Sequence, residues 1–336
     1  DHARRHRAGA GAPMNEERAL IAETCDRLFA EHLDAAVFAN AESGVFPQAL
    51  WDAIVANGLN RILVPEAQGG SGLGWEDAHV VLAAAGRHVA PVPLAETIAA
   101  GWLLGRAGID ISDGIVTLGV PVGDGAMELP WGRHAGHAVV AEAGSVRCVA
   151  LDGAEISDDR NIGRDPRDRV TGLEVGEVTS DPVRAAGALA RACQMAGAAA
   201  AVLDLCVDYA NERVQFGRPI GRFQAIQQQL AVMASETAAA GVAARDACRA
   251  VDAGGDIEAA AASAKIRAGD AAGKAAMIAH QVHGAIGFTD EYRLHHLTRR
   301  LWAWRSEFGA EAHWAGLLGR RVISRGADNL WPDLTG

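Results

Sequence analysis

Apolar residues recur at helical spacing through most of the first hundred residues. Between Glu16 and Phe29, for example, Leu20, Ile21 and Leu28 share one face of a helix. Pro and Gly residues separate this segment from three similar ones. Those further helices are predicted over Pro47–Asn57, Glu76–Val89 and Leu94–Leu104. The pattern therefore predicts an N-terminal helical domain over residues 14–108.

The pattern changes between residues 109 and 180, where short runs of β-branched residues are bounded by Gly, Asp or Pro. Such runs are typical of strands. The predicted strands lie at Val139-Val140, Val146–Leu151 and Val170–Val178. This stretch is short and rich in glycine, so we predict a small β middle domain.

From residue 181 to residue 336 the chain is rich in alanine and again helical in its periodicity. Asp181 can cap a helix N-terminus, and Pro182 suits the first turn. The predicted helices span 182–214, 222–253, 256–283 and 294–325, the last with a break near Gly309. Four long helices with short connections form a bundle. The predicted fold class is thus mainly α, with a helical N-terminal domain, a small β middle domain and a C-terminal four-helix bundle.

The composition of the chain argues against nucleic acid and membranes as partners. The formal net charge is −11 and 49% of residues are hydrophobic. An acidic chain lacks the basic footprint that nucleic acid requires, so no nucleic-acid partner is expected. No uninterrupted apolar run approaches the length of about 20 residues that a membrane span needs, so no membrane partner is expected either. Residues 1–13, which precede Met14, read as a remnant of the expression vector and are excluded from the fold prediction.

The five cysteines are odd in number, scattered and never in a CxxC pair. Such cysteines are most often small buried hydrophobic residues in a reducing compartment, which favours a cytoplasmic location. A zinc site is expected to show closer spacing of its ligands along the sequence. The sequence therefore predicts no metal site.

Two segments are unusual for turns within a bundle. Arg213–Gln224 (RVQFGRPIGRFQ) places arginines and aromatic rings beside flexible backbone just before a helix start, which suits a bound diphosphate. Gln281–Tyr292 (QVHGAIGFTDEY) offers hydrogen-bonding side chains and glycines that allow close approach of a ligand. Taken alone, each segment is better explained as a turn between two helices.

Taken together, the two segments resemble the acyl-CoA dehydrogenase family, whose bundle carries an R-x-Q/T-F-G-x-P segment and a Q-x-x-G-G-x-G-F/Y segment. Val64–Gly72 (VPEAQGGSG) and Arg87–Pro93 (RHVAPVP) are also similar to N-terminal segments of that family. The resemblance implies the family's fold, an acyl-CoA substrate and FAD as cofactor. In the family the two bundle segments hold the adenine and pyrophosphate part of the FAD seated in a neighbouring subunit. By this resemblance the FAD-binding residues are Arg213, Gln215, Phe216, Ile220, Phe223, Gln281, His283, Gly284 and Gly287.

The chain departs from the family at the catalytic base. The family's base is commonly a glutamate after the second FAD segment, and that place falls at Phe308. Other members place the base early in the first bundle helix, which falls near Gly187. Neither residue can accept a proton. Glu307 is adjacent, but one residue along a helix turns the side chain by about 100°. We therefore predict no catalytic base in this chain, with Glu307 as the alternative.

The middle domain departs as well. The family carries a T-E-P-x-x-G-S-D segment there, and Thr117–Asp124 (TLGVPVGD) stands in its place. The chain has the two bundle segments that, in the family, contact a neighbour's FAD. It lacks the base and the middle-domain segment that would hold an FAD of its own. This asymmetry resembles the heterotetrameric acyl-CoA dehydrogenases of bacterial steroid side-chain degradation. The expectation is a subunit that is inactive alone and pairs with a fuller homologous subunit carrying the base. The alternatives are a self-sufficient enzyme that uses Glu307 and a flavin-free structural subunit.

Overall fold

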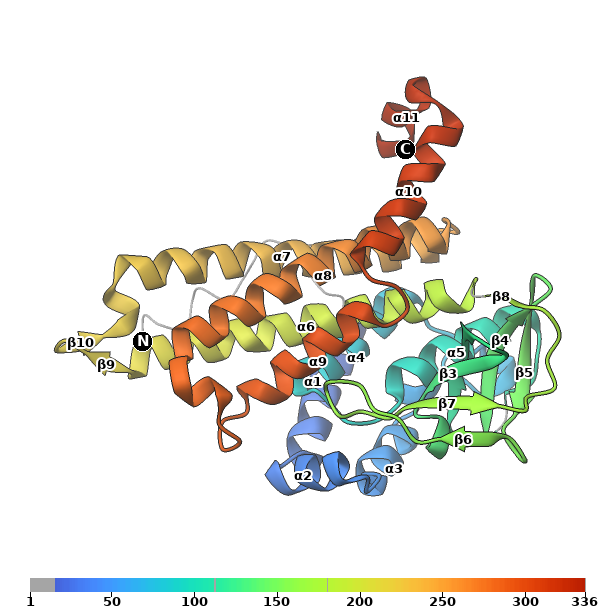
Figure 1. The fold of residues 1–336 in the computed structure, drawn as a ribbon, viewed down its shortest axis with the longest axis horizontal. Coiled ribbons are helices and arrows are strands. Elements are labelled where there is room, and N and C mark those ends of the chain that lie inside the picture. Colours follow the sequence, from blue (N-terminus) through green and yellow to red (C-terminus); the bar gives the residue numbers. More distant parts are fainter. Residues whose placement is uncertain (1–15, 112, 180, 336) are drawn as a thin grey trace.

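The computed structural model describes residues 16–111, 113–179 and 181–335, and it arranges them in three parts (Figure 1). N-terminal helices and a small β unit pack along one side of a bundle of long C-terminal helices. The predicted fold class, mainly α with a small β middle domain, is confirmed. The remnant assigned to residues 1–13 lies outside the described residues.

The N-terminal part contains one helix more than the pattern predicted. Its helices are α1 (Glu16–His32), α2 (Ala35–Ser43), α3 (Gln48–Ala56), α4 (Trp75–His88) and α5 (Leu94–Ala107). The additional helix, α2, begins where the Asp34 carboxylate accepts a hydrogen bond of 2.8 Å from the Val37 amide, and it ends at Gly44 with φ +106°. None of its residues is fully buried. It therefore lacks the apolar stripe that reveals a helix in a sequence.

The middle part folds into two small sheets. Its strands are β1 (Val116–Leu118), β2 (Val120–Gly123), β3 (Ala126–Pro130), β4 (His137–Glu142), β5 (Ser145–Ala150), β6 (Glu155–Ser157), β7 (Arg167–Thr171) and β8 (Val178–Thr179). One sheet has the order β1-β4-β5, with β8 paired to β4, and the other has the order β2-β3-β7-β6. The β1–β4 pair is parallel and the other pairs are antiparallel. The strand predicted over Val170–Val178 is divided in two, because the chain turns at Gly172 with φ +76°.

The C-terminal part is the predicted bundle. Its helices are α6 (Val183–Glu212), α7 (Gln224–Asp252), α8 (Ile257–His283), α9 (Leu294–Ser306) and α10 (Glu311–Arg325), followed by a short α11 (Leu330–Thr335). The predicted break is real, because the backbone has positive φ at Phe308 (+55°) and Gly309 (+102°). Asp181 does not cap α6 as predicted: Pro182 holds the cap position, and none of the described residues caps it with a side chain.

The helix at the centre of the fold is α6, which contacts α4, α5, α7, α8 and α9. Among the described helices it is the one that is long and apolar enough to cross a membrane by length and composition, but 89% of its most apolar window is buried inside the structure. This burial explains its Ala-rich sequence, because small side chains let neighbouring helices approach on every side.

The backbones of α4 and α6 meet directly. A Cβ atom placed on Gly86 would lie 2.0 Å from the carbonyl oxygen of Gln194, and one placed on Gly197 would lie 1.9 Å from the carbonyl oxygen of Ala83. Gly86 of α4 thus packs against α6 three residues before Gly197. In the same way, Gly197 packs against α4 three residues before Gly86. This reciprocal contact joins the N-terminal helices to the bundle.

A carboxylate adds a second link between α4 and the bundle. Asp252, at the end of α7, accepts hydrogen bonds from the Trp75 amide at 2.8 Å and the Glu76 amide at 2.9 Å. These amides open the first turn of α4 and have no partner within that helix. The last residue of α7 therefore caps α4, although the two are far apart in the sequence.

Candidate functional site

The first predicted FAD segment forms a hairpin at one end of the bundle. After α6 ends, β9 (Val214–Gln215) pairs with β10 (Arg218–Pro219), and Phe216 (φ +52°) and Gly217 (φ +76°) make the turn between them. The Phe216 side chain is 92% exposed. Its ring packs edge-on against that of Phe223 with centroids 6.2 Å apart. An exposed aromatic ring is thus displayed at the tip.

The same hairpin carries positive charge. Arg213, Arg218 and Arg222 are all exposed, and no described carboxylate forms an ion pair with any of them. The Arg218 guanidinium lies 4.3 Å from the centre of the Phe223 ring, which holds it over the hairpin. Three unpaired guanidinium groups beside an exposed ring suit a ligand that combines an anion with a flat aromatic group.

The second segment lies at the same end, because α6 and α8 run in the same direction and their C-terminal ends meet (Figure 1). The Tyr209 ring, near the end of α6, stacks on the His283 ring at the end of α8 with centroids 4.4 Å apart. Gln281 is exposed, and Gly284 is exposed with φ +61°. The fold therefore brings the two predicted segments together.

Two of the predicted contact residues serve packing instead. His283 is 4% exposed, and its ring nitrogens already have partners: Nδ1 lies 2.9 Å from the Ala279 carbonyl oxygen and Nε2 lies 3.1 Å from the Tyr292 hydroxyl. A Cβ atom on Gly287 would lie 3.1 Å from both the His283 Cβ and a methyl group of Leu294. His283 therefore offers no free nitrogen to a ligand, and Gly287 permits the close packing of this turn.

The remaining predicted residues keep an accessible position. Gln215 is exposed on the hairpin, while Ile220 and Phe223 are half-buried along the 3-10 turn Ile220–Arg222 and its end. Phe223 contacts both the Phe216 ring and the Arg218 guanidinium, while Ile220 packs against the main core.

The two positions at which the family places its base lie against each other near the other end of α6. Ring atoms of Phe308 lie 2.5 to 2.7 Å from the point where a Cβ atom on Gly187 would be. Phe308 is buried, with 7% of its surface exposed. One position is thus a phenyl ring and the other is the glycine that makes room for it. Neither can take up a proton.

Glu307, the alternative base, is fully engaged in a buried ion network. Its carboxylate oxygens accept hydrogen bonds from Arg167 at 2.8 and 2.7 Å, from Arg191 at 2.7 Å and from Asn161 at 2.7 Å. Burial alone would raise the pKa of the Glu307 carboxyl, but the charges of Arg167 and Arg191 and the hydrogen bonds lower it to about 2. A carboxylate with so low a pKa and no free oxygen is a poor proton acceptor. The geometry therefore argues against Glu307 as the base.

The ion network extends along α6 next to Gly187, one of the two positions at which the family places its base. Arg191, one helical turn after Gly187, also pairs with Glu96 of α5 and with Gln194. Arg191 and Glu96 are 2% and 1% exposed. Paired charges therefore fill the region between α5 and α6. The sequence pattern did not indicate Arg167, Arg191 or Glu96 as site residues, although Arg191 and Glu96 are isolated charges within apolar helical segments.

The cavity beside the base position is small. It has a volume of about 230 Å³ and lies between β2, β3, the start of α6 and the loop before α10. Glu128, Arg184, Phe308 and His313 are among the residues that line it. Ligand pockets usually measure about 300–1,000 Å³. This cavity is therefore smaller than the usual range for a ligand pocket.

The stability that Glu307 provides should depend on pH. Because the folded pKa, about 2, lies below the ordinary value of 4.5, the carboxylate stabilises the fold fully above pH 4.5 and loses this effect as the pH falls through 2. The difference in unfolding free energy between the wild type and Glu307→Gln should therefore be largest near neutral pH and shrink below pH 4.5. Urea unfolding at several pH values measures this. A difference that grows as the pH falls from 4.5 to 2 would contradict it.

Family models match most of the chain. The model described as "Acyl-CoA dehydrogenase, C-terminal domain" matches residues 185–323, and the model described as "Acyl-CoA dehydrogenase, N-terminal domain" matches residues 15–110. The chain is also similar to acyl-CoA dehydrogenase IpdE2 of Mycobacterium tuberculosis. The two are 31% identical over 292 residues, which cover 83% of this chain and 89% of IpdE2.

Solved structures share the fold. The structure described as the "Tcur3481-Tcur3483 steroid ACAD G363A variant" has a TM-score of 0.83 and 25% identity, and the match covers 93% of this chain and 99% of that one. The ChsE4-ChsE5 complex from Mycobacterium tuberculosis also has a TM-score of 0.83, at 21% identity, and that match covers 95% and 100% of the two chains.

Proposed function

This chain belongs to the acyl-CoA dehydrogenase family, and we propose that it is the base-lacking subunit of a heteromeric, FAD-dependent member. In this proposal a fuller homologous subunit carries the base and encloses the flavin ring. The present chain binds the adenine and pyrophosphate part of that FAD. The reaction is the dehydrogenation of an acyl-CoA thioester between its α- and β-carbons.

The observation that carries the proposal is the contact between Phe308 and Gly187. Both family positions for the base lack a carboxylate. The Phe308 ring occupies the space that a side chain on Gly187 would need. Behind them the network of Arg191, Glu96 and Glu307 occupies the space next to the base position. The adjoining cavity of about 230 Å³ is smaller than the usual range for a ligand pocket. A complete dehydrogenation site of this chain's own is therefore unfavourable.

The opposite end of the bundle fits part of an FAD. The unpaired guanidinium groups of Arg213, Arg218 and Arg222 suit a pyrophosphate, and the exposed Phe216 ring suits contact with an adenine. Gln215 and Gln281 are exposed and offer amide hydrogen bonds, while Gly284 allows the backbone to approach a ligand. When bound, FAD accepts a hydride from the substrate. This chain's own residues would bind and orient it.

The similar proteins support one class of partner and substrate. One similar structure, a steroid ACAD, is designated by a pair of names, Tcur3481-Tcur3483, and another is a complex of ChsE4 with ChsE5. Both matches cover nearly the whole of this chain. We therefore propose a heteromeric assembly for this chain and, as substrate, the CoA thioester of a steroid side chain.

We expect FAD to be retained by the complex and not by this chain alone. The visible absorbance spectrum of the chain, purified alone and then co-expressed with an acyl-CoA dehydrogenase chain from the same gene cluster, tests this. A flavin band only in the complex, at about one FAD per heterodimer, supports the proposal. A full flavin band on the chain alone would overturn it.

A single substitution separates the shared site from a merely structural role. Charge-assisted hydrogen bonds to a phosphate contribute about 1.5–3 kcal/mol, so Arg213→Ala should weaken FAD retention by the complex on the order of 10- to 100-fold. Arg27→Ala is the matched control, because Arg27 is also exposed but lies on α1. If Arg213→Ala leaves both FAD content and complex formation at the wild-type level, the chain is a flavin-free structural subunit.

A further inference from the structure

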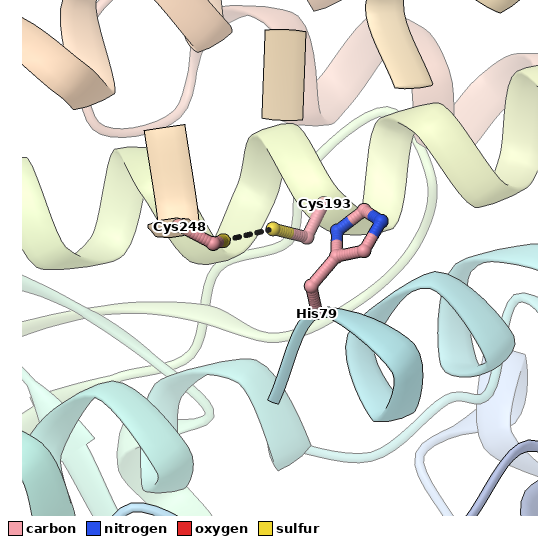
Figure 2. Close-up of side chains that lie close together, drawn as sticks. All are labelled: His79, Cys193 and Cys248. Atoms are coloured by element: carbon pink, nitrogen blue, oxygen red, sulfur yellow. Dashed lines mark hydrogen bonds between the residues drawn. The ribbon is translucent and has the colours of Figure 1, made fainter. Parts of the chain in front are cut away.

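Three side chains from three helices converge in the core between α4, α6 and α7 (Figure 2). They are His79 of α4, Cys193 of α6 and Cys248 of α7. The Sγ atoms of Cys193 and Cys248 are 3.5 Å apart, and one ligand atom from each of the three residues lies within 4.8 Å of the other two. Both cysteines are fully buried.

The chemistry of this set is that of a site for a thiophilic metal ion. Two thiolates and one imidazole are ligands that zinc prefers, and such a Cys₂His set leaves one position of a tetrahedral site open. Two sulfur atoms bound to one zinc ion at about 2.3 Å lie roughly 3.8 Å apart in tetrahedral geometry. The observed separation of 3.5 Å is close to that value.

A second observation concerns the imidazole. The His79 Nδ1 atom is buried and has no hydrogen-bond partner among the described residues. A buried polar atom without a partner is unfavourable, and such atoms in a folded protein need an explanation. A metal ion bound to this nitrogen and to the two sulfur atoms would supply the missing partner.

One member of the cluster also borders a cavity. His79 lines a cavity of about 410 Å³ between α1, α4, α6 and α7, which is also lined by Arg245 and Arg249 and by small residues such as Gly197. An ion in this cavity would meet the His79 side chain, which is the member of the cluster that lines it. Water or a small anion from the cavity would complete the four ligands, and the two arginines favour an anion there.

We propose that His79, Cys193 and Cys248 bind one thiophilic divalent cation such as Zn²⁺, with a fourth ligand supplied from the cavity. The site is separate from the proposed FAD-binding segments and does not depend on the proposed function. The bound ion would tie α4 of the N-terminal part to α6 and α7 of the bundle.

The protonation of the two thiols is consistent with this geometry. The hydrogen bond from Cys248, which outweighs the opposing effect of burial, lowers the pKa of the Cys193 thiol. Burial, followed by the interaction with Cys193, raises the pKa of Cys248. Both thiols would lose their protons on binding a cation, because the thiolate is the form that binds a metal.

Cobalt substitution tests the site. The full chain, alone or with its partner, is reduced, treated with a chelator and titrated with Co²⁺. One Co²⁺ per chain should produce sulfur-to-cobalt charge-transfer bands and the visible bands of tetrahedral cobalt, and Zn²⁺ should abolish both. Because even loss of an outer-shell partner weakens metal binding about 10- to 100-fold, Cys193→Ser and Cys248→Ser should each weaken it by at least about 100-fold. His79→Ala should weaken it by at least about 10-fold.

Cys206→Ser is the matched control, because Cys206 is a buried cysteine on the same helix, α6. It should leave the cobalt spectrum unchanged, and circular dichroism checks that each variant is folded. Three outcomes would overturn the proposal. They are the absence of thiolate bands in the wild type, bands that survive Cys193→Ser, and a Cys193–Cys248 disulfide as the sole product when metal is added without reductant.

Discussion

Replacing Gly197 with alanine is expected to destabilise the protein by about 3 kcal/mol or more. The new methyl group would lie 1.9 Å from the Ala83 carbonyl oxygen and 2.7 Å from its carbonyl carbon. These are backbone atoms, so no side-chain rotation can relieve the overlap, and α4 and α6 must move apart. Thermal and urea unfolding, followed by circular dichroism, measure the effect.

The control for this substitution is Gly241→Ala. Gly241 lies in α7, another long bundle helix, and a Cβ atom there would meet no atom of the described residues within 4 Å. Alanine favours a helix over glycine by up to about 1 kcal/mol, so this variant should unfold at the same urea concentration as the wild type or a higher one. If Gly197→Ala unfolds no earlier than Gly241→Ala, the close crossing of α4 and α6 is not a determinant of stability.

Replacing Arg191 with methionine is expected to destabilise the protein by about 3–5 kcal/mol, because it leaves the buried Glu96 carboxylate without its partner and removes one of the two arginines that pair with Glu307. Arg191 pairs with Glu307 and Glu96, and its guanidinium also lies 5.5 Å from the centre of the Trp304 ring. Methionine has a similar length but supplies no charge and no hydrogen bond. The midpoint of urea unfolding at neutral pH measures the loss.

A double variant distinguishes the unpaired charge from the lost packing. Adding Glu96→Gln to Arg191→Met removes the buried carboxylate that has lost its partner. The double variant should therefore recover about 1 kcal/mol or more relative to Arg191→Met alone. Arg27→Met, on the exposed face of α1, should change stability by no more than about 0.5 kcal/mol. Equal stability of the double and single variants would show that charge pairing contributes little here.

The core of this protein is filled in two opposite ways at the two places that these substitutions test. At the α4–α6 crossing the helices touch through backbone, because glycine leaves no side chain between them. Between α5 and α6 a network of Arg191, Glu96, Glu307 and Arg167 occupies the space instead. The paired charges of this second region leave no site for a base or a substrate. In the proposed function the partner subunit supplies that site.

The sequence alone determined what depends on short-range interactions. Helical periodicity with Gly and Pro boundaries located the long helices, and the structure begins and ends them within a few residues of the predicted ranges. The two glycine-containing segments were sufficient to indicate the family, which the family models and IpdE2 confirm. The absence of a carboxylate at Phe308 and Gly187 also followed from position along the chain. The short helix α2 was missed because it buries none of its residues fully.

Only the tertiary structure decided which distant residues meet. It buried His283 with both ring nitrogens occupied, paired Glu307 with Arg167 and Arg191, and joined His79 to Cys193 and Cys248. The cysteines showed no metal-ligand spacing in the sequence because the three ligands come from three different helices. Such contacts depend on the crossing angles and distances of helices, which are set by side chains packing across the whole core. Periodicity within one segment determines the face that a side chain occupies, but the packing of the helices determines what that face meets.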